Sequence, residues 1–240
     1  MKIILRRLKD GKLKIDEVPR PSLEPGCALV QVHYSAVSSG TERAALELGK
    51  SNLLKKAKNR PDELRRLLQK IKTEGAVSSL KQVWNRLDTW TPLGYSCAGV
   101  VLAVGPDVRN IMPGDSVACA GGEFANHAEI VSIPQNLIVK VPSTVSLEDA
   151  AFTTLGAVAI SGVRLTDVRF GDVVGVIGIG LIGALTVQVL KAAGCRVVGF
   201  DINSERANFA FQIGADGIAS TAEEFSAISA ELSSGNGLDA

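Results

Sequence analysis

Three glycines and one aspartate carry the most specific chemistry in this sequence. The glycines follow the pattern Gly178-x-Gly180-x-x-Gly183, and Asp201 lies 18 residues beyond the last of them. Gly178 allows a tight turn, Gly180 lets the backbone approach a diphosphate, and Gly183 lets a helix pack closely on a strand. The turn also presents the positive end of a helix to phosphates. An acidic residue at this distance accepts hydrogen bonds from ribose hydroxyls, so the pattern predicts a dinucleotide site.

The flanking residues supply the elements that this site needs. The apolar run Val173–Ile177 predicts a buried parallel strand, a helix follows and ends at Gly194, and Val197–Phe200 predicts a second strand that leads into Asp201. This strand–turn–helix–strand context makes the glycine pattern specific, and the alternative is a βαβ unit that binds nothing. The predicted cofactor contacts are Gly178, Gly180, Leu181, Ile182, Gly183, Asp201 and Asn203.

The charge of Asp201 predicts which dinucleotide is bound. NADP carries a phosphate on the 2′-oxygen of its adenosine ribose, and that phosphate would meet the like charge of a carboxylate at Asp201. We therefore expect NAD as the cofactor, with NADP disfavoured.

Composition places the chain among ordinary soluble globular proteins. Hydrophobic residues make up 46% of the 240 residues, charged residues 21%, and the net charge of +1 gives no indication of nucleic-acid binding. The four cysteines are scattered without a C-x-x-C pair, and the N-terminus shows neither a signal peptide nor an apolar run of the ~20 residues that span a membrane. These features predict a cytoplasmic protein with free thiols that binds no membrane.

The chain divides into a β-rich part and a βαβ part. Residues 2–18 predict a hairpin around Asp10-Gly11, and short strands separated by Pro and Gly turns continue to Val141, as in an antiparallel barrel. Ser146 predicts an N-cap for a helix leading to the βαβ part. We therefore expect an α/β protein with a substrate domain at residues 1–145 and a dinucleotide-binding domain at residues 146–240.

A basic helical insertion interrupts the β-rich part at about residues 44–90. Residues 41–90 carry 12 Lys and Arg against 6 Asp and Glu, a local charge of +6. The insertion is interpreted either as a solvated face over a packed apolar stripe or as a lid that attracts an anionic, for example phosphorylated or nucleotide-linked, sugar.

The last forty residues predict a helix over Ser204–Ile213, a third strand at Gly217–Ala219, and a helix to about Leu232 that begins with a capping box at Ser220–Glu223. In a doubly wound sheet of order 3-2-1-4-5-6, strands 4 to 6 build the nicotinamide half of the site. This chain supplies strands 1 to 3 and the first residues of strand 4. We therefore expect an incomplete Rossmann domain, that is, a fragment of a longer protein.

Three further motifs, together with the glycine loop and Asp201, resemble the medium-chain dehydrogenases/reductases, the superfamily of the zinc alcohol dehydrogenases. The motifs lie at Gly94–Gly105, Pro113–Val117 and Ala128–Val131. The resemblance covers everything except the insertion, and it implies a GroES-like antiparallel barrel followed by a Rossmann domain.

The chain departs from this family where the zinc members hold their metal. Ser39 stands in place of a cysteine, and Gly94-Tyr95-Ser96 stands in place of Gly-His-Glu. Where the family has a third ligand, usually a cysteine, this chain has Thr154-Leu155-Gly156. The lobe with four cysteines for structural zinc is also missing. Zinc needs soft or borderline ligands such as Cys and His, so we expect no zinc and no other metal.

A narrower resemblance is to the zinc-free half of bacterial bidomain oxidoreductases, in which a second NAD-dependent oxidoreductase half of the Gfo/Idh/MocA type follows. The shared residues are Ser35–Leu46 (SAVSSGTERAAL) and the basic insertion. The SSGTE loop also resembles that of bacteriochlorophyllide dehydrogenases, so the substrate stays open. The resemblance implies a second oxidoreductase domain after residue 240, and it leaves a homo-oligomer open.

Without a metal, hydroxyl groups and a base must act on the substrate oxygen. Thr41 matches the position whose hydroxyl relays the substrate proton in zinc members, and Glu42 follows it directly. Tyr95 replaces a metal-site residue and is expected to face the same cleft. We expect Thr41, Tyr95 and Glu42 to be catalytic, the alternative being that they only hold the loop in place. Ser96 is expected to face the same cleft, and His127 is a further candidate base with a structural role as the alternative.

These observations predict an NAD-dependent, zinc-independent oxidoreductase that transfers hydride between nicotinamide and a secondary alcohol or carbonyl, for example on a sugar derivative. One alternative is an NADPH-type enone or quinone reductase, against which Asp201 argues. The other is a non-catalytic nucleotide-binding interaction module.

Overall fold

The computed structural model describes residues 1–7, 9–38, 40 and 88–240. Its contacts divide the chain into two compact units, Met1–Phe152 and Thr153–Ala240, called unit 1 and unit 2 below, and each is described by itself. Thr41, Glu42 and nearly all of the predicted helical insertion lie outside the described residues. The insertion is predicted to extend to about residue 90, but Trp90 belongs to strand β4, Trp90–Pro92.

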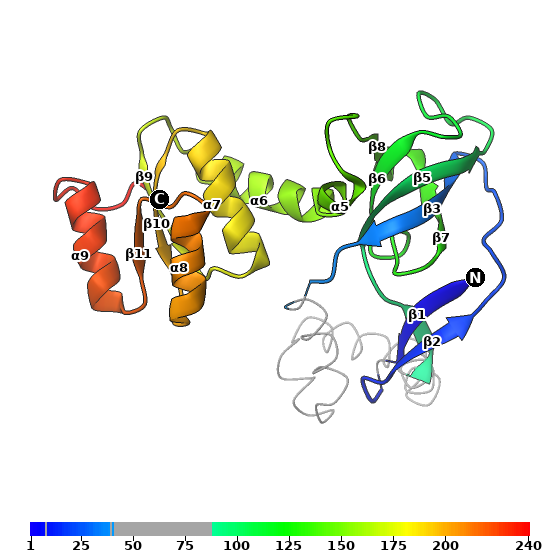
Figure 1. Cartoon of the computed structure of the whole chain (residues 1–240), viewed down its shortest axis with the longest axis horizontal. Coiled ribbons are helices and arrows are strands. Elements are labelled where there is room, and N and C mark those ends of the chain that lie inside the picture. The colour runs from blue at the N-terminus through cyan, green and yellow to red at the C-terminus, as the bar shows by residue number, and fades with distance from the viewer. Residues whose placement is uncertain (8, 39, 41–87) are drawn as a thin grey trace, which may run out of the picture. The chain divides into compact units, whose positions relative to one another are not determined.

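Unit 1 is built on a five-stranded antiparallel sheet (Figure 1). The strand order is β7-β3-β5-β6-β8, with β3 and β5 at its centre. The bounds are β3 Cys27–Ser35, β5 Ser96–Val104, β6 Ser116–Ala120, β7 Ile130–Pro134 and β8 Ile138–Lys140, with a 3-10 turn at Gln135–Leu137 before β8. Short strands joined at Pro and Gly turns are therefore what the structure contains, as the sequence predicts.

A smaller antiparallel sheet in unit 1 has the order β2-β1-β4. Its strands are β1 Lys2–Arg7, β2 Leu13–Glu17 and β4 Trp90–Pro92. Lys2 pairs with Glu17 and Arg6 with Leu13, so the predicted hairpin around Asp10-Gly11 is confirmed. Gly11 adopts a positive φ of 66°, which a glycine reaches without strain.

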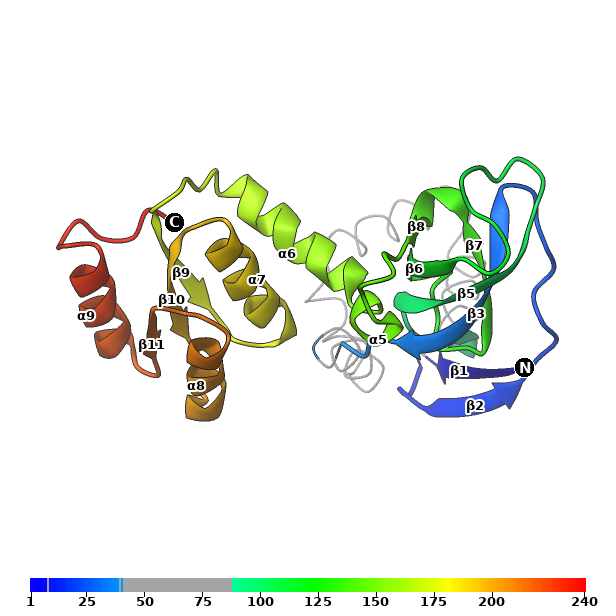
Figure 2. The same ribbon diagram turned by 45° about the horizontal axis from the view of Figure 1, so that its top comes forward.

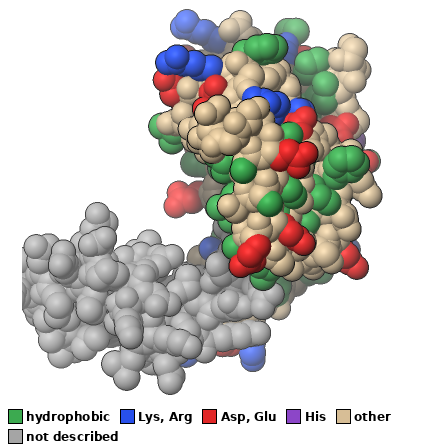
Figure 3. Space-filling view, turned by 90° about the vertical axis from the view of Figure 1, so that its left-hand side faces the viewer, with side chains coloured by type: hydrophobic (Ala, Val, Ile, Leu, Met, Phe, Trp, Pro, Cys, Tyr) green, Lys and Arg blue, Asp and Glu red, His purple; other side chains and the backbone are tan. Residues whose placement is uncertain are grey.

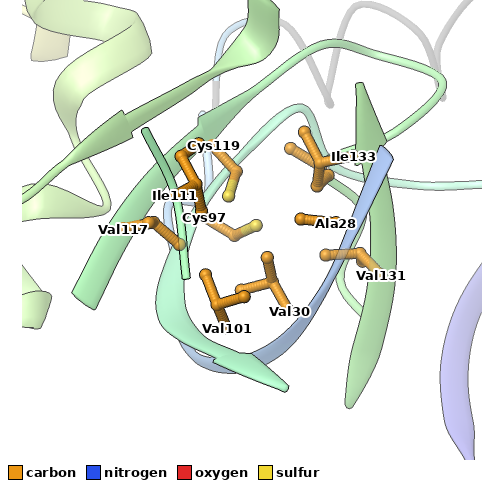
Figure 4. Close-up of a cluster of buried hydrophobic side chains, with 10 residues drawn as sticks. Ala28, Val30, Cys97, Val101, Ile111, Val117, Cys119, Val131 and Ile133 are labelled. Carbon is orange, nitrogen blue, oxygen red and sulfur yellow. The ribbon is translucent and has the colours of Figure 1, made fainter. Parts of the chain in front are cut away.

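The core of unit 1 lies inside the five-stranded sheet (Figure 4). Side chains from β3, β5, β6 and β7 converge there, because alternate residues of each strand point inward. Cys97 and Cys119 are cross-strand partners in this core and are free thiols. The hydrogen bond with Cys97, together with burial, raises the pKa of the Cys119 thiol. Cys119 therefore stays protonated and behaves as a small apolar residue.

The short helix α5, Leu147–Ala150, belongs to unit 1. Ser146 caps it by accepting a hydrogen bond from the Asp149 N–H, as the sequence predicts. Ala150 and Ala151 pack against Ala98 and Ala118 of the large sheet. The two units consequently divide between Phe152 and Thr153, whereas the sequence places the domain boundary at the helix cap.

Unit 2 is a three-stranded parallel sheet of order β11-β10-β9 with helices on both faces. Helices α7 and α8 cover one face and α9 the other (Figure 1), and α6 packs against α7 (Figure 2). The strands are β9 Val173–Ile177, β10 Arg196–Phe200 and β11 Gly217–Ala219. The helices are α6 Thr153–Leu165, α7 Leu181–Ala192, α8 Ser204–Gln212 and α9 Ala222–Leu232.

Glycines set the close packing of helices on this sheet. A Cβ at Gly175 would lie 2.8 Å from the ring of Phe225 in α9, and a Cβ at Gly199 would lie 2.8 Å from the Cβ of Ala210 in α8. The two helices approach the sheet on opposite faces at positions where a side chain is absent. The core of unit 2 between the sheet and α7 is apolar. It includes Val174, Val176 and Val197 from the strands and Val187 and Leu190 from α7.

The edge of β9 opposite β10 pairs with residues near the end of the sequence. The Asp239 N–H donates to the Val173 carbonyl at 2.9 Å, and the Gly175 N–H donates to the Ala240 oxygen at 2.9 Å. The Asp239 carboxylate also accepts from the Val173 N–H at 2.8 Å. These bonds place the residues after α9 beside β9, where the sequence predicts the first residues of a fourth strand.

The capping box of α9 lies one residue later than the sequence predicts. Thr221 is the N-cap and Glu224 the third helical residue, with the Thr221 hydroxyl accepting from the Glu224 N–H at 3.2 Å. The Glu224 carboxylate accepts from the N–H groups of both Ser220 and Thr221. The predicted box at Ser220–Glu223 is wrong, because Ser-Thr and Glu-Glu offer the same spacing in two registers.

This difference predicts the outcome of two neighbouring substitutions. Thr221→Ala removes the side-chain acceptor of the cap and should lower the free energy of unfolding by about 1 kcal/mol. Ser220→Ala leaves the cap in place and should cost less than about 0.5 kcal/mol. Urea unfolding measures both free energies of unfolding. A larger loss of stability for Ser220→Ala than for Thr221→Ala would indicate that Ser220, and not Thr221, is the N-cap.

Candidate functional site

The glycine loop follows β9 and leads directly into α7. Gly178 has a φ of +92°, and its N–H donates to the Phe200 carbonyl at 2.7 Å, which fixes the loop on the end of β10. Gly180 is the N-cap of α7. Within the described part of the chain, the N–H groups of Gly180, Leu181 and Ile182 have no hydrogen-bond acceptor, as expected for a helix start. The predicted strand, turn and helix are therefore confirmed.

Gly178 and Gly180 face open space that a ligand can occupy, whereas Gly183 is in close contact with the protein itself. A Cβ added at Gly178 or at Gly180 would have nothing within 4 Å. A Cβ at Gly183 would lie 1.9 Å from the Gly178 carbonyl oxygen, so the helix can approach the loop only because residue 183 is glycine. The first turn of α7 carries no acidic residue. Free N–H groups, open space and a positive dipole end together form a cradle that suits a diphosphate.

Asp201 lies at the end of β10 and is buried, with 6% of its surface exposed. One carboxylate oxygen accepts from the Ile179 N–H at 2.8 Å and the other from the Asn203 N–H at 2.9 Å. Each carboxylate oxygen can accept a second hydrogen bond, so two acceptor positions stay available for the hydroxyls of a ribose.

Three neighbours of Asp201 complete this corner of unit 2. The Asn203 side chain caps α8 by accepting from the N–H groups of Glu205 and Arg206, so its side-chain oxygen serves the helix. The Arg206 guanidinium lies 4.0 Å from the Asp201 carboxylate and is largely exposed. Ile202 is 86% exposed directly beside Asp201 and offers an apolar surface to a base or ring.

Three contributions are not among the sequence predictions: the Arg206 guanidinium, the exposed Ile202 side chain and the Ile179 N–H. The sequence signal for Arg206 is its place in the first turn of α8, five residues after Asp201. The hydrogen bond from the Ile179 N–H to Asp201 has no such signal, because the donor is backbone and its side chain is an ordinary buried isoleucine.

Ser96 is the first residue of β5 in unit 1 and Tyr95 directly precedes it, and the two side chains differ in their surroundings. Ser96 is buried, and its hydroxyl donates to the Ala151 carbonyl at 2.6 Å, so it ties the segment after α5 to the sheet. Tyr95 is half-buried, and among the described residues its hydroxyl has no hydrogen-bond partner. Of the two side chains, only Tyr95 therefore has a hydroxyl that is available to a substrate.

His127 is packed near the same end of the large sheet. Its Nδ1 lies 2.8 Å from the Ser35 hydroxyl at the end of β3, and the imidazole is buried. A Cβ at Gly94 would lie 2.7 Å from the His127 backbone nitrogen and 3.0 Å from the ring. The ring is thus held between Ser35 and the Gly94 backbone, directly before Tyr95. This environment fits the structural role that the sequence left open for His127, and its role as a base stays a prediction.

Two positions of family zinc ligands lie among the described residues, and both carry hydroxyl side chains. The described residues contain no group of three or more His, Cys, Asp or Glu side chains that could hold a metal. At the positions of family ligands, the Ser96 hydroxyl already donates to a carbonyl, and the Thr154 hydroxyl oxygen is buried without a partner. Neutral hydroxyls of this kind are poor ligands for zinc.

A family model described as "Zinc-binding dehydrogenase" matches residues 182–240 of this chain. The D-guloside 3-dehydrogenase of Shigella flexneri is 36% identical over 125 residues, which cover 52% of this chain and 35% of that protein. The (R,R)-butanediol dehydrogenase of Bacillus subtilis is 31% identical over 150 residues, covering 51% and 42%. The chain thus spans less than half the length of these curated relatives.

Among solved structures, the galactitol-1-phosphate dehydrogenase of Escherichia coli matches with a TM-score of 0.73 at 20% identity, covering 97% of this chain and 66% of that one. The chain has the fold of the medium-chain dehydrogenases/reductases. The predicted order, a GroES-like antiparallel barrel followed by a Rossmann sheet, is confirmed. Unit 1 supplies the barrel and unit 2 the parallel strands with the glycine loop.

The packing of Gly183 leads to a prediction about this loop. Gly183→Ala places a Cβ against a backbone carbonyl that cannot move away, so it should destabilise unit 2 by about 2 kcal/mol or more. Gly156→Ala is the matched control, because Gly156 lies within α6 with nothing near its Cβ position, and it should stabilise the helix by about 0.5–1 kcal/mol. Urea unfolding of both variants tests this, and equal effects would contradict it.

Proposed function

We propose that this chain is the cofactor-binding and substrate-binding part of an NAD-dependent, zinc-independent oxidoreductase. The observation that carries the proposal is the corner of unit 2 where the open glycine loop and the buried Asp201 carboxylate meet. The N–H groups of Gly180, Leu181 and Ile182 would hold the diphosphate of the cofactor, and Asp201 its adenosine ribose. NAD, when bound, supplies a nicotinamide that accepts or donates hydride.

The choice of NAD over NADP rests on charge and burial. A 2′-phosphate would have to lie beside a carboxylate that is 6% exposed and poorly screened by solvent. Among the described residues, one ion pair of Asp201 is found, and its cation is Arg206, whose guanidinium lies 4.0 Å from the carboxylate. Because the guanidinium is paired with Asp201, a 2′-phosphate would have to compete for it.

The substrate we propose is a secondary alcohol or carbonyl on a sugar derivative. Support comes from the curated relative with the highest identity given above, whose name describes oxidation at position 3 of a guloside. Tyr95 is a candidate hydroxyl donor to the substrate oxygen, because its hydroxyl has no partner among the described residues. Thr41 and Glu42 remain candidates for the transfer of the substrate proton on the grounds of sequence alone.

The proposal includes further partners that the sequence suggests. These are a small-molecule substrate that is anionic or sugar-linked, a second oxidoreductase domain and a homo-oligomer, with no nucleic acid. On the face seen from the side of α9, acidic and basic side chains are interspersed with apolar ones (Figure 3), which is unlike the basic stripe of a nucleic-acid interface.

A cytoplasmic location is part of the same proposal. In the described part of the chain, every helix is too short or too polar to span a membrane.

Titration calorimetry with NAD and NADP tests the proposed cofactor. NAD should bind at least about tenfold more tightly than NADP, because only NADP brings a phosphate to the buried carboxylate. Equal affinities would remove the NAD preference, and a preference for NADPH would favour the enone or quinone reductase. Binding of NAD by a full-length protein that oxidises no alcohol would favour the non-catalytic module.

Metal analysis of the purified protein tests the zinc-independent part of the proposal. The protein should contain well below one zinc per chain after purification without chelators, since hydroxyl side chains stand at the described ligand positions. Addition and removal of zinc should leave the thermal unfolding temperature unchanged. Stoichiometric zinc that survives dialysis would contradict this part of the proposal.

A further inference from the structure

The Asp201 carboxylate contacts the glycine loop directly. Its contact with the loop is the hydrogen bond from the Ile179 N–H at 2.8 Å. Ile179 is itself 3% exposed, so this N–H has little access to water. If the carboxylate were removed, a buried donor would be left without an acceptor, which is a costly arrangement.

The other carboxylate oxygen connects Asp201 to α8. It accepts from the Asn203 N–H at 2.9 Å, and Asn203 is the N-cap that begins that helix. The backbone of Asp201 is held as well, because its N–H donates to the Ala219 carbonyl in β11. Asp201 is therefore anchored by two neighbouring elements and extends from this anchored position to the middle of the glycine loop.

We propose that Asp201 is a positioning residue for the diphosphate as well as a contact for the ribose. By accepting from the Ile179 N–H, the carboxylate fixes the loop residue that lies between Gly178 and Gly180. The following N–H groups, which have no acceptor of their own, are thereby held in the orientation that a diphosphate needs. The inference rests on the proposed binding of NAD at this site and deepens it.

Electrostatics alone predicts the opposite effect of removing Asp201, which makes the inference testable. A carboxylate near an anion site repels the anion, so its removal should strengthen the binding of a diphosphate. If the carboxylate instead orders the loop, its removal should weaken that binding. Adenosine cannot distinguish these accounts, because loss of the ribose contact weakens adenosine binding in both. Inorganic pyrophosphate can, since it has no ribose.

The experiment is calorimetric titration of inorganic pyrophosphate into the wild-type chain and two alanine variants. Asp201→Ala should lower the affinity for pyrophosphate by about tenfold, because binding must then also supply the cost of ordering a loop that the carboxylate no longer fixes. Glu205→Ala is the matched control, because it removes an exposed carboxylate from the first turn of α8 without touching the loop. This control should leave the affinity within about twofold of the wild type or raise it slightly.

Pyrophosphate affinity that is unchanged or higher in Asp201→Ala would overturn the inference. A purely structural role of Asp201 would lower the unfolding temperature but would leave the pyrophosphate affinity of the folded variant unchanged or higher. If the wild-type chain binds NAD and pyrophosphate and Asp201→Ala binds pyrophosphate equally well, only the positioning role is contradicted. A wild-type chain that binds neither molecule sinks the proposed function and the inference together.

Amide hydrogen exchange of the wild-type chain gives a second test that needs no variant. The Ile179 amide should exchange slowly in the free protein, whereas the amides of Gly180 and Leu181, which lack acceptors, should exchange fast. Addition of pyrophosphate should then slow the exchange of Gly180 and Leu181. Fast exchange at Ile179 in the free protein would overturn the inference even if Asp201→Ala does not fold.

Discussion

The parallel register of β9 and β10 is the constraint on which the candidate site depends. Ile177 lies opposite Phe200, so the two strands end at the same level. The residues that follow, Gly178 and Asp201, therefore emerge side by side at the carboxyl edge of the sheet. The hydrogen bond from the Gly178 N–H to the Phe200 carbonyl continues the pairing by one residue and joins the two loops. A shift of this register by one residue would separate the carboxylate from the loop and would move Gly199 away from its close contact with α8.

Glycine serves two physical purposes in this corner of the molecule, and they are easily confused. At Gly178 and Gly180 the absent side chain leaves open space on the ligand side of the loop. At Gly183 the absent side chain allows a backbone contact within the protein itself. Side chains at the first two positions would compete with a ligand, whereas a side chain at the third would disturb the fold.

Much of unit 2 could be predicted because its signals are local and redundant. Gly194 closes α7 with a positive φ of 80°, Gly214 follows α8, and the apolar run before the glycine loop is β9. The sequence predicts the capping box one residue early, because neighbouring Ser-Thr and Glu-Glu pairs satisfy the same spacing and only the backbone conformation decides between them. The boundary between the units also depends on tertiary packing, since Ala150 and Ala151 carry no sequence mark that assigns them to the barrel.

The candidate site shows the same limit at the level of single bonds. The identity of Asp201 as an acceptor follows from its spacing, but its partner in the loop is a backbone N–H that no residue type announces. Similarly, Ser96 and Tyr95 are neighbours in the sequence, yet the packing of Ala151 against β5 engages one hydroxyl and leaves the other without a partner among the described residues. Residue types thus indicate the chemistry, and three-dimensional contacts decide which groups are available for it.

The most direct test of the account is a crystal structure of this chain with NAD. We expect the diphosphate on the N–H groups of Gly180, Leu181 and Ile182, with both adenosine ribose hydroxyls within hydrogen-bond distance of the Asp201 carboxylate. An empty glycine loop at saturating NAD, or a bound cofactor whose ribose lies away from Asp201, would contradict this expectation.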